Sequence, residues 1–272
     1  MDLWVGIALD QNSRDRMEDI VDVRLFQGGG IFIVLDGHNG NLALNFVAKV
    51  LSLNIVNAME SHSIDAALQI AFAQTEEALL AYLIEECIGK EDTECECMAE
   101  LPILTSGVVA CVVVLKGEDI YTAHVGDSRA VLGRKNFEAL QLTMDHSMSN
   151  ATERIRIETI PEGVSLDEGY VNGLMVTRSL GNVCCRTKTK CTGQIAIPTI
   201  SKFHSVDDQF ILIASDGLFE VFSNEAVVGE IRRAMMRPSF SPTKICQELV
   251  QRAISRGSCD NICACIILLD KR

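Results

Sequence analysis

The sequence lacks a long hydrophobic run, a secretory signal and an excess of basic residues. No apolar run approaches the ~18 residues that cross a bilayer, so we expect no membrane span. The opening stretch, MDLWVGIALDQNSRDRMED, has no basic start and too short an apolar segment for a secretory signal. Lys and Arg number 24 against 37 Asp and Glu, which gives a net charge of −13. Because so acidic a protein repels nucleic acid and anionic membrane surfaces, we expect neither as a partner.

The cysteines also lack the pattern of a disulfide framework or a zinc site. There are eleven, an odd number that cannot all pair. The clusters at 95–97 and 184–191 have no paired Cys-x-x-Cys spacing. Cys111, Cys263 and Cys265 lie within apolar runs, where a thiol behaves as a small core residue. We therefore expect a reduced protein of the cytoplasm, the nucleus or both.

Long linkers, low-complexity tracts and repeats are absent as well, so we expect one domain over residues 1–272. The chain begins directly with strand-like sequence, as a core domain or a piece of a longer protein would. With 48% hydrophobic residues it can bury a sizeable core. Helices and strands do not alternate strictly as in parallel α/β folds. This favours antiparallel sheets with helices packed outside, an α+β sandwich.

Apolar periodicity and turn residues predict the elements of this fold. A loop is expected at 90–100. The predicted strands are 21–25, 31–35, 108–115, 120–125, 130–133, 138–142, 195–203, 210–214 and 262–269. The predicted helices are 42–59, 64–84, 152–158, 224–236 with Ser223 as N-cap, and one that is capped by Ser241, begins at Pro242 and ends at Gly257.

Acidic residues stand at the ends of three buried-looking strands. Asp36 directly follows such a strand, Asp216 follows another, one residue after its end, and Asp260 lies just before the last one. If the last two strands pair antiparallel, Asp216 and Asp260 meet at one sheet edge, and Asp36 joins them if its strand is a neighbour. Carboxylates held this close repel one another, and hard divalent cations such as Mg²⁺ or Mn²⁺ relieve the repulsion.

Such a cluster suits the hydrolysis of phosphate esters. Two cations about 4 Å apart can share a water that loses a proton and attacks phosphorus. Gly37, without a side chain, lets its carbonyl approach a metal closely. His38 is placed to protonate the leaving oxygen as general acid. Arg14, near Glu18, could bind a phosphate in a bidentate manner.

Eight short motifs resemble those of the metal-dependent protein serine/threonine phosphatases of the 2C type. Each motif is weak alone, and their shared order along nearly the whole chain carries the resemblance. In this sequence they are Arg14 to Asp19, Asp36-Gly37-His38-Asn39-Gly40, Ser106 to Ala110, Val125-Gly126-Asp127-Ser128-Arg129, Leu142-Thr143-Met144-Asp145-His146, Val176 to Asn182, Ser215 to Glu220 and Cys259-Asp260-Asn261.

The resemblance implies a four-layer α-β-β-α sandwich, with two packed antiparallel sheets flanked by helices. It implies a phosphatase in which His38 is the general acid, Arg14 binds the phosphate and Asp36 bridges the two ions. The further ligands that it implies are the Gly37 carbonyl, Asp216 and Asp260 for the two main ions, Glu18 and Asp19 through waters or at the rim, and Asp127 with Glu220 for a weaker third ion.

Four residues depart from the motifs of that family. Asn39 replaces a glycine but tolerates the same backbone region, so we expect little effect. Val109 replaces a threonine and keeps its shape. Glu220 replaces an aspartate, and its longer side chain is expected to alter or weaken the third ion site. Asn182 replaces an aspartate near a flap over the site, where it affects flap anchoring and substrate preference.

Three functions remain open at this point. The first is an active protein serine/threonine phosphatase, acting as a monomer on phosphoprotein substrates with Mg²⁺ or Mn²⁺. The second is a non-catalytic regulator that keeps the fold, which the departures at Asn182, Val109 and Glu220 motivate. The third is another two-metal hydrolase such as a nuclease, against which the acidic charge argues.

Overall fold

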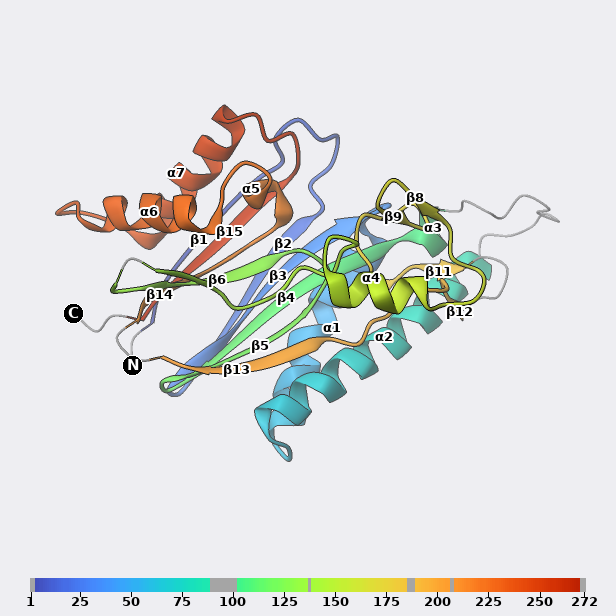
Figure 1. Cartoon of the computed structure of the whole chain (residues 1–272). Helices are drawn as coiled ribbons and strands as arrows, with labels where there is room; N and C mark the ends of the chain where they lie inside the picture. Colours follow the sequence, from blue (N-terminus) through green and yellow to red (C-terminus); the bar gives the residue numbers. More distant parts are fainter. Residues whose placement is uncertain (1–2, 89–101, 137, 185–188, 206–207, 270–272) are drawn as a thin grey trace.

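Two antiparallel sheets packed face to face form the centre of the protein, with a pair of long helices on each outer side (Figure 1). The computed structural model describes residues 3–88, 102–136, 138–184, 189–205 and 208–269. The predicted loop at 90–100 lies outside these residues. The layers confirm the predicted α+β sandwich.

The larger sheet has the strand order β13-β5-β4-β3-β2, and the short β10 also pairs with β4. Its two central strands are covered on both faces, so they are continuous apolar runs and show no alternation. The strands of this sheet are β2 (Asp19–Phe26), β3 (Gly29–His38), β4 (Gly107–Lys116), β5 (Asp119–Val125), β10 (Leu180–Gly181) and β13 (Thr199–His204).

The smaller sheet has the order β1-β15-β14-β6-β7, so the first strand of the chain pairs with the last. The predicted antiparallel pairing of the last two strands is confirmed, with Ala214 opposite Ala264. The strands of this sheet are β1 (Trp4–Asp10), β6 (Arg129–Arg134), β7 (Ala139–Gln141), β14 (Asp208–Ala214) and β15 (Ile262–Leu268).

The long helices cover the outer faces of the sheets. The larger sheet carries α1 (Asn41–Met59) and α2 (Ile64–Ile88), and the smaller one carries α6 (Asn224–Met235) and α7 (Pro242–Ser255). As predicted, the Ser223 hydroxyl caps α6 by accepting a hydrogen bond from Ala226 N at 3.2 Å. The shorter elements are α3 (Pro102–Thr105), α4 (Ala151–Glu158), α5 (Asp216–Phe219), the pair β8 (Leu166–Asp167) and β9 (Tyr170–Val171), and the pair β11 (Val183–Cys184) and β12 (Thr189–Lys190).

A third core lies between the two sheets, where apolar side chains of both interdigitate. Cys111, Cys263 and Cys265 are part of it, and all three are buried free thiols. The prediction that they serve as small core residues is therefore confirmed.

Three details differ from the sequence-based expectations. Ser241 precedes Pro242 at the start of α7 as predicted, but its side chain makes no capping hydrogen bond. The strand predicted at 195–203 begins only at Thr199, since Pro198 cannot donate a ladder hydrogen bond, and Ile195 forms an isolated parallel bridge with Arg178. By length and composition alone, α1 could cross a membrane. This was not expected from the sequence, because only uninterrupted apolar runs were considered and α1 contains polar residues. In the structure α1 packs Val47, Leu51 and Ile55 into the core beneath the larger sheet.

Candidate active site and metal centre

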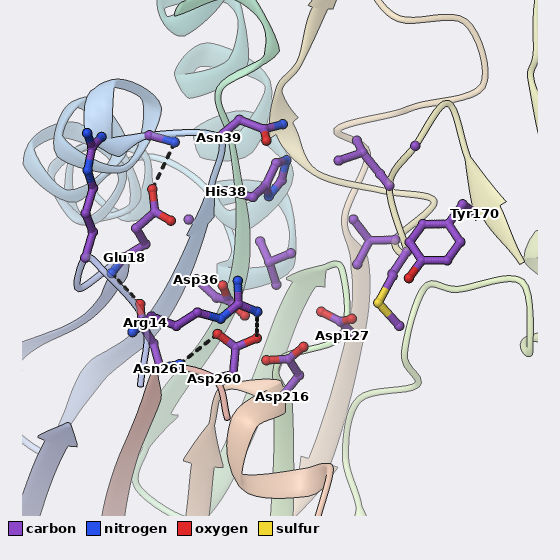
Figure 2. Close-up of a pocket in the computed structure, with 18 of the residues that line it drawn as sticks. Arg14, Glu18, Asp36, His38, Asn39, Asp127, Tyr170, Asp216, Asp260 and Asn261 are labelled. Atoms are coloured by element: carbon purple, nitrogen blue, oxygen red, sulfur yellow. Dashed lines mark hydrogen bonds and ion pairs between the residues drawn. The ribbon is translucent and has the colours of Figure 1, made fainter. Parts of the chain in front are cut away.

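A cavity of about 670 Å³ opens where β3, β5 and β14 end and where β15 begins (Figure 2). Acidic side chains from both sheets point into it, and Tyr170 together with residues 173–176 forms one side. The residues that line it are Arg14, Asp15, Arg16, Glu18, Asp36, Gly37, His38, Asn39, Gly40, Val109, Asp127, Tyr170, Gly173, Leu174, Met175, Val176, Asp216, Asp260 and Asn261.

Asp216 and Asp260 meet because their strands are antiparallel neighbours, as predicted. Asp216 is the first residue of α5, one residue after the end of β14, and Asp260 lies before β15. The two loops touch through their backbones, since a Cβ on Gly217 would lie 2.2 Å from the Asn261 carbonyl oxygen. Only glycine permits so close an approach.

Asp36 also lies beside Asp216, but its strand is not a neighbour in the same sheet as was expected. Its strand, β3, belongs to the larger sheet and is no neighbour of β14 or β15 within a sheet. Asp36 meets Asp216 across the interface between the two sheets, and Asp127, in the turn after β5, joins them. Carboxylate oxygens of these three residues lie within 4.8 Å of one another. A second such group consists of Asp216, Glu220 and Asp260.

The electrostatics of these groups fit a divalent cation. Burial, followed by the charges of Asp19, Asp216, Asp127 and Asp260, raises the pKa of Asp36 well above its usual value. Burial and Asp216 raise the pKa of Asp127 to about 8, and burial and Asp260 raise that of Asp216 to about 6. A bound cation would therefore stabilise the ionised form of each of these carboxylates. Their oxygen atoms are also the ligands that Mg²⁺ and Mn²⁺ prefer.

Glu18 and Asp19 occupy different positions, although they are adjacent in sequence. Glu18 lines the cavity, where its Oε1 accepts a hydrogen bond from Gly40 N at 2.9 Å and its carbonyl accepts one from Gly37 N at 2.7 Å. Asp19 is 3% exposed and lies behind the cavity, so it is not at the rim. Its Oδ2 accepts a hydrogen bond from Ser215 Oγ at 2.6 Å, and burial raises its pKa to about 7.

The two residues predicted for a third ion, Asp127 and Glu220, lie in different groups of acidic side chains. Asp127 belongs to the group with Asp36, whereas Glu220 belongs to the group with Asp260. Among the described residues no such group joins Asp127 to Glu220. The physical reason is that Glu220 ends the short helix that Asp216 begins, which keeps it on the side of Asp260.

Arg14, the predicted phosphate ligand, is at the cavity but is engaged with an acid. Its Nη2 lies 2.6 Å from Asp260 Oδ2, and its side chain is 59% exposed. The guanidinium can therefore leave Asp260 without disturbing the core.

His38, the predicted general acid, lines the cavity beside Asp36. Its Nε2 contacts the side-chain amide of Asn182, at 3.1 Å from Oδ1 and 3.0 Å from Nδ2. Burial lowers the pKa of His38 to about 4. Asn39, as expected for a residue in place of glycine, adopts a positive φ of 59°.

Several residues that support the site were not assigned a role from sequence. Asn261 Oδ1 accepts a hydrogen bond from Glu18 N at 2.7 Å, and its Nδ2 donates to Gln11 O at 2.8 Å, which fastens the loop before β2. Arg129 forms a bidentate pair with Asp145, at 3.1 and 2.6 Å, two residues after Asp127. The motifs that contain these residues were recognised, but nothing in the sequence showed which motif contacts which.

Comparisons with known proteins identify the family of the chain. A family model described as Protein phosphatase 2C matches residues 25–262. The chain is 30% identical over 244 residues to "Probable protein phosphatase 2C 54" of Oryza sativa subsp. japonica, covering 86% of this chain and 60% of the rice protein. It is 32% identical over 277 residues to "Probable protein phosphatase 2C 69" of Arabidopsis thaliana, covering 98% and 70% of the two proteins.

Solved structures share the fold at lower identity. The serine-threonine phosphatase 2C from Toxoplasma gondii superposes with a TM-score of 0.77 at 18% identity, covering 97% of this chain and 94% of that one. A C. elegans sex determining protein gives a TM-score of 0.83 at 21% identity, covering 99% of this chain and 65% of that one. The chain thus spans about two thirds of the length of several of its relatives. From the matched family model and these relatives, the chain belongs to the protein phosphatase 2C family.

Proposed function

We propose that this chain hydrolyses phosphoserine and phosphothreonine in proteins with the help of two divalent cations. The observation that carries the proposal is a pair of clusters, each of three acidic side chains, that share Asp216. One cluster contains Asp36 and the other contains Asp260. Residues 36, 216 and 260 come from strand ends of two different sheets, so their convergence is a property of the whole fold. The same convergence does not favour a non-catalytic regulator.

The donor set indicates which residues would hold the ions. Asp36, Asp216 and Asp260 would provide carboxylate oxygens, and Gly37 would provide its carbonyl, because no side chain shields it. Glu18 would take part through water from its position in the cavity wall. When bound, Mg²⁺ or Mn²⁺ supplies an acidified water that can attack phosphorus.

The chain's own side chains would bind the phosphate and move the proton. Arg14 would exchange Asp260 for two phosphate oxygens, to which a guanidinium fork is complementary. His38 would donate a proton to the serine or threonine oxygen as the P–O bond breaks, since an alkoxide is a poor leaving group.

The experiment is hydrolysis of phosphoserine, phosphothreonine and phosphotyrosine peptides with Mn²⁺ or Mg²⁺, repeated with excess chelator. We expect turnover of the first two peptides, loss of turnover on chelation, and loss in Asp36→Asn. His38→Ala should keep divalent-cation binding in calorimetry and lose about 10²- to 10⁴-fold in rate on phosphoserine peptide. Turnover that persists without metal would refute the proposal.

We also propose that the protein acts as a monomer on phosphoproteins in the cytoplasm or nucleus. The free, buried thiols Cys111, Cys263 and Cys265 support a reducing compartment, and the charge of −13 argues against nucleic acid. Light scattering and imaging of the tagged full-length protein would test both. A stable dimer, or retention in the secretory pathway, would contradict them.

A further inference from the structure

The contact between His38 and Asn182 links the cavity to a loop far away in the sequence. The loop between β10 and β11 brings the Asn182 amide against the imidazole, with Nε2 at 3.1 Å from Oδ1 and 3.0 Å from Nδ2. Asn182 is 2% exposed. Its amide is therefore a fixed part of the wall behind the histidine.

The neighbours of Asn182 fix the orientation of its amide. Nδ2 donates to Thr105 O at 2.8 Å, and Oδ1 accepts from Ser179 Oγ at 2.6 Å. The backbone N–H of Asn182 donates to Ser106 O at 3.0 Å. Its φ of 59° lies in the left-handed region, which asparagine tolerates better than most residues. These bonds do not involve His38, so the amide is held in place whether or not the imidazole moves.

The preceding residue is fastened to α2 in a similar way. Gly181 N donates to Glu76 Oε2 at 2.8 Å, and Lys190 Nζ donates to Gly181 O at 2.6 Å. Lys190 and Glu76 are themselves an ion pair at 2.9 Å, mostly buried. The helix α2, which covers the larger sheet, thus supports the loop that contacts His38.

The packing around the contact leaves no spare room. A Cβ on Gly107 would lie 2.2 Å from Asn182 Oδ1 and 2.4 Å from His38 Nε2. Any side chain at 107 would push the two groups apart. The glycine that opens β4 is thus required for the imidazole and the amide to meet.

We propose that Asn182 is a positioning residue for His38, an inference that rests on the phosphatase function proposed above. Asn182 Oδ1 accepts a hydrogen bond from His38 Nε2–H, which fixes the orientation of the imidazole ring. Within the described part of the chain the hydrogen bonds of His38 all involve Nε2, so Nδ1 is the nitrogen left for a substrate. The acid is the imidazolium form of His38, in which both ring nitrogens carry a proton. As the attacking hydroxide bonds to phosphorus and the ester P–O bond breaks, the Nδ1–H bond breaks and its proton forms an O–H bond on the departing serine oxygen. The neutral ring keeps the Nε2–H, which stays hydrogen-bonded to Asn182 Oδ1, and a proton from solvent then restores the Nδ1–H.

Asn182→Gly is the variant that tests this, because glycine removes the amide and accepts the positive φ. With Mn²⁺ we expect kcat on a phosphoserine peptide to fall about tenfold or more, as for a misplaced general acid. KM should stay within about twofold. On p-nitrophenyl phosphate, whose leaving group needs no proton, the loss should stay within about threefold.

Asn172→Gly is the matched control. Asn172 also has a positive φ, of 53°, and its side chain bonds to Ser165 N and Thr192 O without contacting His38. It should leave the ratio of the two kcat values unchanged. In a His38→Ala background, Asn182→Gly should cause no further loss, because a positioning residue acts only through its partner. Equal losses on both substrates, or losses that add to those of His38→Ala, would overturn the proposal.

A readout without turnover separates this inference from the phosphatase function. In ¹⁵N-histidine NMR, with His38→Ala to assign the signal, Asn182→Gly should shift the His38 ring resonances and Asn172→Gly should not. An unshifted His38 signal overturns the inference even in an active enzyme. A wild-type protein without turnover refutes only the phosphatase function. If Asn182→Gly does not fold, Ser179→Ala removes the hydroxyl that orients Oδ1, and it should shift the same resonance.

Discussion

Replacing Glu153 with glutamine is expected to lower the free energy of unfolding by roughly 2–3 kcal/mol at neutral pH. Glu153 lies on α4 and is 1% exposed. Its carboxylate accepts hydrogen bonds from Arg156, Arg178 and Thr177, at 2.8 Å from Arg156 Nη2 and 2.7 Å from Thr177 Oγ1. The glutamine would be neutral and would leave two guanidinium groups without their acid. Since residue 176 lines the cavity, the same bonds brace the cavity wall.

The pKa of Glu153 gives the magnitude and the pH window. Burial opposes ionisation, but the hydrogen bonds from Arg178, Arg156 and Thr177 outweigh it and lower the pKa from 4.5 to about 2. At 1.36 kcal/mol per unit, that difference corresponds to roughly 3 kcal/mol. Because the folded-state pKa lies below the unfolded one, the stabilisation is fully present above pH 4.5 or so and is lost as the pH falls through about 2.

Urea denaturation of wild type and Glu153→Gln between pH 3 and pH 8 would measure this. We expect a constant difference between pH 6 and pH 8 that shrinks below pH 4.5. Glu158→Gln, an exposed acid of the same helix, is the control and should stay within about 0.5 kcal/mol of wild type. A Glu153→Gln protein as stable as the control, or a difference independent of pH, would refute the reasoning.

Three further predictions concern the cavity, and a glycine of α6 away from it serves as a control. Mn²⁺ at about 100 times its Kd should raise the free energy of unfolding by about 2.7 kcal/mol, seen as a higher Tm, and Asp216→Asn should abolish most of the rise. Gly217→Ala, whose Cβ would meet the Asn261 carbonyl at 2.2 Å, should destabilise by about 1–3 kcal/mol in urea denaturation and weaken Mn²⁺ binding in calorimetry. Gly229→Ala in α6, with nothing within 4 Å of its Cβ, should instead stabilise by about 0.5–1 kcal/mol. Arg14→Ala should change stability by less than about 1 kcal/mol, because the pair with Asp260 is exposed, and should raise KM for phosphopeptides; an unchanged KM would contradict its role as a phosphate ligand.

The sequence was informative where the site depends on neighbours within one sheet. Asp216 and Asp260 were placed together because consecutive strands pair antiparallel most readily, and the structure has them so. Asp36 was expected through the same reasoning, yet it arrives from the opposite sheet. Which faces of two sheets pack together depends on the whole core, and no local pattern of residues encodes it.

Two other contacts show where the limit lies. The i, i+4 spacing of Asp216 and Glu220 on a short helix could have placed Glu220 on the Asp260 side, but the family resemblance led to Asp127. The contact between His38 and Asn182 left no such signal. It joins the last residue of β3 to a loop 144 positions further along the chain, and each looks like an ordinary turn in the sequence.

The pairing of β1 with β15 means that the cavity depends on two segments that lie about 250 residues apart in the sequence. Asp260 and the loop fastened by Asn261 take their places only when the final strand enters between β1 and β14. A chain without β15 would thus carry most of the acids of the cavity but would lack Asp260 and the strand that joins β1 to β14. The smaller sheet and the acidic end of the cavity are therefore expected to form together, because both need β15.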